Sequence, residues 1–195
     1  MNKFVKKTRI SGNLNVTGPV LAKTAAVMLP LYKELAKSRL FASKWCQAVR
    51  EADLGTIQKL FRSKVPSARI ESLSTNGIGF FVDLSFPKPL EYYTNATTIP
   101  PGTVQFTYSS SVIRRLSASV LPFYRGLSSS PLYAKSVANA VRLGDKRKLN
   151  LLIRLYVKST FLIAVETGPS GFSLAFKYPA ERYVYMNEFF HESLF

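Results

Sequence analysis

The sequence predicts an α+β fold in which one β-α-α-α-β-β unit occurs twice, the two halves packing with pseudo-twofold symmetry. The first observation is an internal repeat: Leu29-Pro30-Leu31-Tyr32 returns as Leu121-Pro122-Phe123-Tyr124, an offset of 92 residues. About a quarter of the positions from 13 to 103 match the residue 92 places later. The second is a globular composition, 47% hydrophobic and rich in Phe and Tyr. A unit of this size buries a modest core, so we expect the two units to pack together.

The repeat divides the 195 residues into four segments. Residues 1–12 form a basic N-terminal arm containing Lys3, Lys6, Lys7 and Arg9. Residues 13–95 form the first unit, 96–104 a linker and 105–195 the second unit.

Each unit is expected to open with a short strand, over residues 14–17 and 106–109, where side chains alternate. An amphipathic helix follows, with Pro30 or Pro122 in its middle. Proline lacks an N–H and clashes with the carbonyl four residues earlier, so a kink is predicted. Two short helices meeting at the proline are the alternative.

Serine and aspartate mark the starts of the next helices. Ser38 and Ser130 are expected to be N-caps of a second helix. Asp53 and Asp145 repeat in the same register, and each directly precedes a third helical pattern. We therefore interpret them as N-caps and not as catalytic carboxylates. Gly144 is typical of a helix C-terminus.

Turn signals predict that a hairpin closes each unit. They lie at Asn76-Gly77 and over 168–171, and the returning strands end at Pro87 and Pro179. The tyrosines that follow are expected either to add short strands or to wrap around the other unit.

The formal net charge is +16, and the basic residues are spread along the whole chain. Such a charge favours polyanionic partners, which include nucleic acid, anionic lipid and acidic protein; plain solubility is the alternative. Several cationic positions repeat, and the third helix of each unit is the most basic. The candidate polyanion-binding residues are Arg50, Lys59, Arg62, Lys64, Arg142, Lys146, Arg147, Lys148 and Arg154. The solvated faces of amphipathic helices are the competing explanation.

No catalytic pattern is present. The single cysteine, Cys46, and the single histidine, His191, are 145 residues apart, and no histidine or cysteine cluster has metal-ligand spacing. The hairpin segment 75–79 precedes no helix, so it is not a phosphate-binding loop. We expect a protein that is not an enzyme and that has no cofactor and no metal.

Aromatic residues gather toward the ends of the chain and of the units. They are candidate contacts between copies of the chain, with packing inside the chain as the alternative. The set is Phe4, Tyr92, Tyr93, Tyr183, Tyr185, Phe189, Phe190 and Phe195.

No segment predicts a transmembrane span, since the longest apolar stretch, Val20 to Leu31, is short and includes Lys23. The basic N-terminus lacks the apolar region of a signal peptide, so synthesis in the cytoplasm is expected and the final location stays open.

Three segments carry a family resemblance: Ala48 to Asp53 with Lys59-Leu60, Ala140 to Asp145 with Lys148-Leu149, and Ala175 to Pro179. They resemble small basic proteins from the spore envelope or parasporal material of spore-forming bacilli. The resemblance implies a structural protein, associated with the spore or the mother cell, that assembles into a lattice, layer or crystal. The first hypothesis is therefore self-assembly, and the alternative is nucleic-acid binding by a repeated basic helix surface.

Overall fold

The computed structural model describes residues 16–88, 90, 92–100, 106–179 and 181–191. Its helices are α1 (Gly18–Lys37), α2 (Arg39–Arg50), α3 (Leu54–Lys64), α4 (Ser110–Ser129), α5 (Pro131–Arg142) and α6 (Lys146–Tyr156). Its strands are β1 (Ile70–Thr75), β2 (Gly79–Ser85), β3 (Tyr92–Thr98), β4 (Leu162–Thr167), β5 (Gly171–Lys177) and β6 (Val184–Phe190). The α+β class is confirmed.

The two halves, α1 to β3 and α4 to β6, repeat the same order of elements. Each element of the second half begins and ends 92 residues after its counterpart in the first. Duplication of an ancestral unit remains our interpretation of this offset.

The strands form one antiparallel sheet in the order β1-β2-β3-β6-β5-β4. The halves therefore join edge to edge, through the pairing of β3 with β6. Ala96 lies opposite Glu188 in this pairing, and these two residues are themselves counterparts at the 92-residue offset. The pseudo-twofold axis consequently passes through the Ala96–Glu188 pair.

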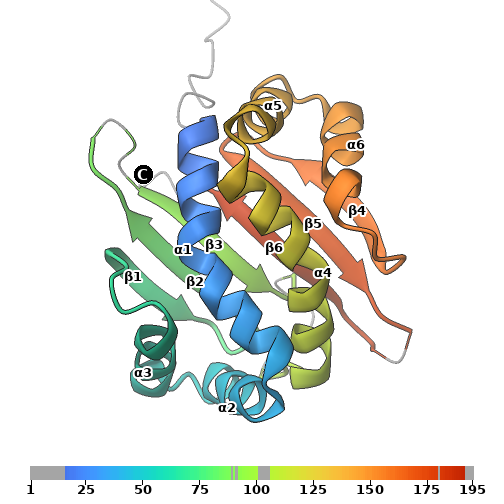
Figure 1. Cartoon of the computed structure of the whole chain (residues 1–195). Helices are drawn as coiled ribbons and strands as arrows, with labels where there is room; N and C mark the ends of the chain where they lie inside the picture. Colours follow the sequence, from blue (N-terminus) through green and yellow to red (C-terminus); the bar gives the residue numbers. More distant parts are fainter. Residues whose placement is uncertain (1–15, 89, 91, 101–105, 180, 192–195) are drawn as a thin grey trace, which may run out of the picture.

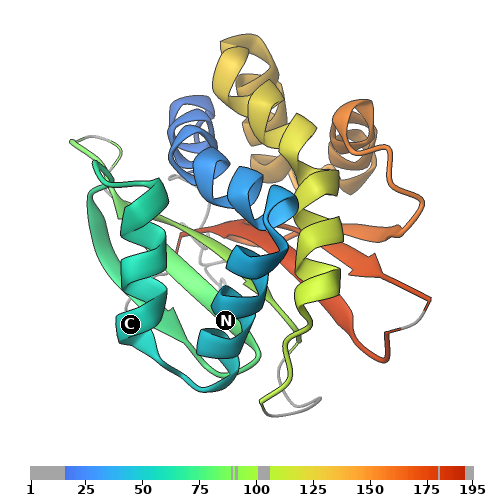
Figure 2. The same cartoon turned by 60° about the horizontal axis from the view of Figure 1, so that its bottom comes forward.

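All six helices cover the same face of the sheet (Figure 1, Figure 2). Helices α1 and α4 run antiparallel across its centre, and the pairs α2/α3 and α5/α6 flank them (Figure 1). Among the described residues, no helix lies on the opposite face. One hydrophobic core lies between the helices and the sheet.

The strand predicted at the start of each unit is wrong. Residues 106–109 contain no strand, and neither do Val16 and Thr17; residues 14 and 15 lie outside the described part. The alternation of side chains in these two segments arises instead from burial of Tyr108 and from helix capping by Thr17. The Tyr108 hydroxyl is buried and donates to the Thr97 carbonyl (2.7 Å), and Thr17 caps α1 by accepting from the Val20 amide. The unit is therefore α-α-α-β-β-β.

The third strand of each unit has a larger role than the sequence predicts. Tyr92 and Val184 begin β3 and β6, the two central strands of the sheet. Residues 96–98, assigned above to the linker, belong to β3. The hairpins β1–β2 and β4–β5 are confirmed.

Helix boundaries follow the predicted signals closely. Asp53 Oδ1 accepts from the Thr56 amide (2.9 Å) and Asp145 Oδ1 from the Lys148 amide (2.8 Å), so the N-cap interpretation of both aspartates is confirmed. Ser38 and Ser130 cap α2 and α5 in the same way. Helices α1 and α4 each continue through their proline, which excludes the alternative of two short helices.

Two tyrosines and two asparagines form a closed polar ring in the core, on the pseudo-twofold axis. Tyr32 donates to Asn95 Oδ1 (2.9 Å) and accepts from Asn187 Nδ2 (2.8 Å). Tyr124 donates to Asn187 Oδ1 (3.1 Å) and accepts from Asn95 Nδ2 (2.7 Å). All four residues are fully buried, and desolvation raises the pKa of Tyr32 to about 12. Each half supplies one tyrosine and one asparagine, so the ring closes only when both halves are in place.

Candidate polyanion-binding surface

The charges of this protein are segregated between the helix layer and the sheet. The six helices contain eighteen lysines and arginines against one glutamate, Glu34, a formal charge of +17. The six strands contain one lysine against four carboxylates, a formal charge of −3. The charge that is spread along the sequence is thus concentrated on one layer in space. Since fourteen of the eighteen cations are exposed, the outer surface of that layer is strongly basic.

Two of the repeated arginines make hydrogen bonds to backbone carbonyls within the chain, and this structural role is one reason for their repetition. Arg62 donates to the Ala68 carbonyl (2.6 Å), and Arg154 donates to the Leu162 carbonyl (2.9 Å). Each guanidinium therefore fixes the connection from α3 to β1 or from α6 to β4. These bonds use part of each guanidinium, which presents five donors in total.

The repeated pair Arg50 and Arg142 differs in exposure between the two halves. Arg50 donates to the Tyr108 carbonyl (2.8 Å), which ties α2 to the segment leading into α4. Arg142 is exposed and bonds Asn139 Oδ1 one turn earlier in α5. Arg142 is the more accessible of the two to a partner.

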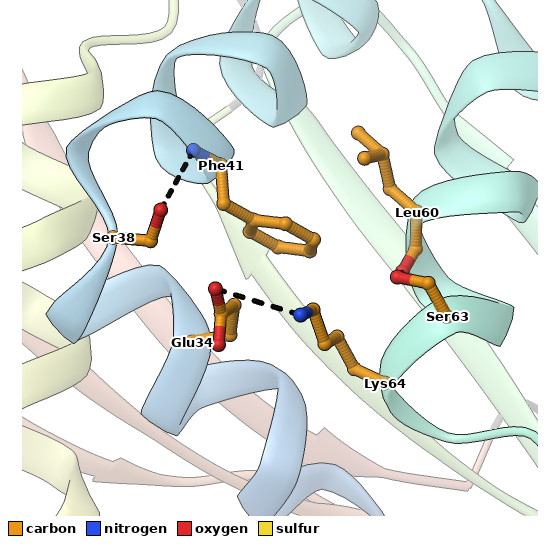
Figure 3. A network of polar contacts seen from close by, with 6 residues as sticks. All are labelled: Glu34, Ser38, Phe41, Leu60, Ser63 and Lys64. Carbon is orange, nitrogen blue, oxygen red and sulfur yellow. Dashed lines mark hydrogen bonds and ion pairs between the residues drawn. The ribbon is translucent and has the colours of Figure 1, made fainter.

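The Lys64 side chain contacts other residues of the first half. Its Nζ lies 3.5 Å from Glu34 Oε1 and 5.4 Å from the centre of the Phe41 ring (Figure 3). Figure 3 also shows Ser38 capping the helix that carries Phe41, so the ends of α1, α2 and α3 meet at this point. Lys64 therefore holds helices together as well as adding charge.

Three consecutive exposed cations lie at the start of α6. Lys146 pairs with Glu166 of β4 at 2.6 Å. Arg147 and Lys148 are exposed, and their side chains make no hydrogen bond or ion pair within the described part of the chain. Lys59 on α3 is also exposed; its charge helps to keep the pKa of Asp53 below its usual value, after the larger effect of hydrogen bonds from Thr56.

A hollow of about 550 Å³ runs between α6 and β4. Its helix side is lined by Lys146, Arg147, Asn150 and Arg154. Residues 163–166 of β4 form its other side, including Glu166. The structure thus brings three of the predicted polyanion-binding residues to a single groove in the second half.

Three of the predicted assembly contacts are wrong because they are buried in the core. The Tyr93 hydroxyl donates to the Ser170 carbonyl (3.2 Å), the Tyr185 hydroxyl accepts from the Ser109 amide (2.9 Å), and Phe189 stacks on Phe172. Their strands are central and not terminal, so these side chains face the helices. Three further aromatics are half-buried and remain candidates: Tyr92, Tyr183 and Phe190. Phe4 and Phe195 lie outside the described residues.

Cys46 and His191 lie in different surroundings. Cys46 is buried, and desolvation raises its pKa to about 12, so the thiol is protonated at neutral pH. His191 stacks on Tyr92, with ring centres 4.4 Å apart. Within the described ranges, no group of three or more His, Cys, Asp or Glu side chains is placed to hold a metal ion. None of the described helices combines the length and apolarity needed to cross a bilayer.

Comparison with models of known protein families, with curated proteins and with solved structures finds no match for this chain.

Proposed function

We propose that this chain is a non-enzymatic nucleic-acid-binding protein that contacts phosphates with the outer surface of its helix layer. The observation that carries the proposal is the formal charge of +17 on the helices against −3 on the strands. Lysine and arginine that neutralise phosphates release counterions, which gives affinity without base readout and a strong dependence on salt. Only two ion pairs occur among the described residues, so most of this charge is available to a partner.

Titration of labelled DNA at several salt concentrations tests the proposal. We expect the logarithm of the association constant to fall linearly with the logarithm of the salt concentration. Arg147→Glu with Lys148→Glu, both on α6, should weaken binding about 10- to 100-fold at low salt, since each contact adds roughly one unit to the slope.

The matched control carries the same change in net charge away from the helix layer. Lys88→Glu with Arg182→Glu alters two exposed cations in the loops between strands. At about 0.1 M salt this variant should lose about threefold or less, because cations more than about 10 Å from the bound phosphates are largely screened. Absence of binding at low salt, or equal losses in the two double variants, would contradict the proposal.

Self-assembly is the second candidate, favoured by the two open edges of the sheet. β1 and β4 have a strand on one side only within the described part of the chain, so the other row of backbone groups is unpaired. Pairing of β4 in one copy with β1 in the next would extend the sheet. Ile163 of β4 is 55% exposed at this edge.

Analytical ultracentrifugation across a wide concentration range, followed by electron microscopy, distinguishes this second function. Ile163→Lys should shift association to higher protein concentration, whereas Leu143→Lys, at an exposed position between α5 and α6, should not. A monomer at every concentration would exclude assembly through the edges.

A further inference from the structure

Each half has a hollow beside the proline of its long helix, and the two hollows occupy equivalent positions. Each measures about 430 Å³. The first is lined by Ala26, Pro30, Lys64, Arg69, Phe86 and their neighbours. The second is lined by the counterparts of these residues, Ala118, Pro122, Tyr156, Phe161 and Tyr178, together with Arg115, Ser119, Lys158 and Ser159.

Aromatic side chains distinguish the second hollow from the first. Tyr156 and Phe161 stand where the first half has Lys64 and Arg69. The Tyr156 ring is held against Gly126, where an added Cβ would come within 2.7 Å of it. Phe161 packs on Tyr178 with ring centres 4.9 Å apart. The walls of the second hollow are thus fixed aromatic surfaces.

Two groups that line the second hollow, the Tyr178 hydroxyl and the Ala118 carbonyl, have unused hydrogen-bonding capacity. The Tyr178 side chain is fully buried, and the one side-chain hydroxyl that acts on its own hydroxyl is that of Ser119, which does not lie in normal hydrogen-bonding geometry with it. The nearby Ser119 hydroxyl instead donates to the Arg115 carbonyl (2.9 Å). The Ala118 carbonyl receives no bond from residue 122, because proline has no N–H to donate. A buried polar group without a partner is unfavourable, so these groups favour a ligand that can hydrogen-bond with them.

Cations stand at the rim of the same hollow. The Arg115 guanidinium lies 4.4 Å from the centre of the Tyr178 ring, and Lys158 is exposed beside it. Both residues line the hollow, which is otherwise mainly apolar. The combination of aromatic walls, unpaired polar groups and a basic rim matches a planar ring attached to an anion.

We propose that this second hollow takes one unstacked base of a single-stranded nucleic acid, with the adjoining phosphate at Arg115 and Lys158. The proposal rests on the function proposed above and specifies the form of nucleic acid. Bases stack on aromatic side chains whatever their sequence, whereas a paired base in a duplex cannot leave the stack without loss of pairing. Helix α6 contributes residues both to this hollow, through Tyr156, and to the basic groove beside β4.

Single-stranded and duplex DNA with equal numbers of phosphates, compared by fluorescence anisotropy, test the proposal. Phe161→Leu should weaken single-strand binding about tenfold and leave duplex binding unchanged, since stacking contributes only to the former. Phe86→Leu, in the first hollow, is the matched control and should change neither. A 2-aminopurine base in the single strand should lose fluorescence on binding to the wild type and not to Phe161→Leu.

Arg115→Gln, at an exposed position, provides a second variant that does not alter the core; it should reduce single-strand affinity more than duplex affinity. Equal loss for both forms of DNA, or no loss with either variant, would overturn the base-binding proposal while leaving phosphate binding by the helix layer intact. Failure of the wild type to bind either form would overturn both proposals.

Discussion

The Tyr32 hydroxyl accepts a hydrogen bond of 2.8 Å from Asn187 Nδ2, across 155 residues of sequence. Its counterpart, Tyr124, accepts from Asn95 Nδ2 at 2.7 Å. Each tyrosine thus accepts a hydrogen bond from the asparagine of the other half and donates one to the asparagine of its own half. The four hydrogen bonds of the polar ring therefore form only when the two halves pack together correctly.

Removal of either hydroxyl from the ring should destabilise the protein by about 1–3 kcal/mol, because a buried asparagine then lacks a partner. We expect Tyr32→Phe and Tyr124→Phe to have similar effects on the free energy of unfolding in urea. Tyr183→Phe, at a half-buried site outside the ring, should have little effect. The double variant should lose less than the sum of the two, and strict additivity would contradict the ring as a cooperative unit.

Two counterpart residues at the ends of α2 and α5 should respond oppositely to exchange. Ala52 and Gly144 both have left-handed backbone, with φ of 53° and 63°. That conformation costs a residue with a Cβ about 1–2 kcal/mol. Ala52→Gly should therefore stabilise and Gly144→Ala destabilise, each by about 1 kcal/mol in urea unfolding. No atom lies within 4 Å of a Cβ added at Gly144, so the effect there isolates backbone strain. Changes of the same sign would refute this explanation.

The close approach of β5 to β6 requires glycine at position 171. A Cβ there would lie 1.8 Å from the Phe189 carbonyl oxygen, part of the backbone. Gly171→Ala should lower the free energy of unfolding by about 3 kcal/mol or more, at or above the usual range for overpacking. Gly168→Ala, where the nearest atom is 3.8 Å away, is the control in the same hairpin. Thermal unfolding would detect the difference. Equal midpoints for the two variants would contradict the close approach of β5 to β6 at Gly171.

Glu188 on the axis should make stability depend on pH. Desolvation raises the pKa of its carboxyl group above the ordinary value, and the hydrogen bond from Thr98 opposes this (2.6 Å). The folded state then holds a proton that the unfolded state releases, so stability falls as pH rises from the unfolded pKa through the folded one. Glu188→Gln should be more stable than the wild type at pH 7.

That gain should shrink at about pH 3, below both pKa values, where the wild-type carboxyl is protonated in either state. Urea unfolding at the two pH values gives the comparison, and the other carboxylates cancel between the two proteins. A gain of the same size at both pH values would show that ionisation of Glu188 has no part in it.

The sequence predicts the helices, the caps and the hairpins because these depend on local chemistry. Asp53 and Asp145 illustrate this, since an aspartate before an apolar helical pattern satisfies nearby amides wherever the helix lies. The central position of β3 and β6 is not local. Tyr93 and Tyr185 look like exposed terminal aromatics until the two strands are known to pair with each other.

The sequence predicts that the candidate site is basic, but it does not predict where on the fold the basic residues gather. Repetition of Arg62 and Arg154 suggested binding, yet their bonds to backbone carbonyls account for part of that repetition. The separation of charge between helices and strands requires knowing that all helices lie on one face. The sequence carries one signal of the polar ring, because Tyr32 and Asn95 are identical to their counterparts.

The edge-to-edge joint of β3 and β6 has a consequence during synthesis. The first half leaves the ribosome 92 residues ahead of the second. At about 5–20 residues per second, β3 therefore waits roughly 5–20 s for β6. During this interval the edge of β3 that pairs with β6 is open, and Tyr32 and Asn95 lack the partners that the second half supplies. Neighbouring nascent chains on one messenger present the same unpaired edge of β3. We therefore expect the speed of translation through the second half to govern how often β3 pairs with β6 of another chain instead of its own.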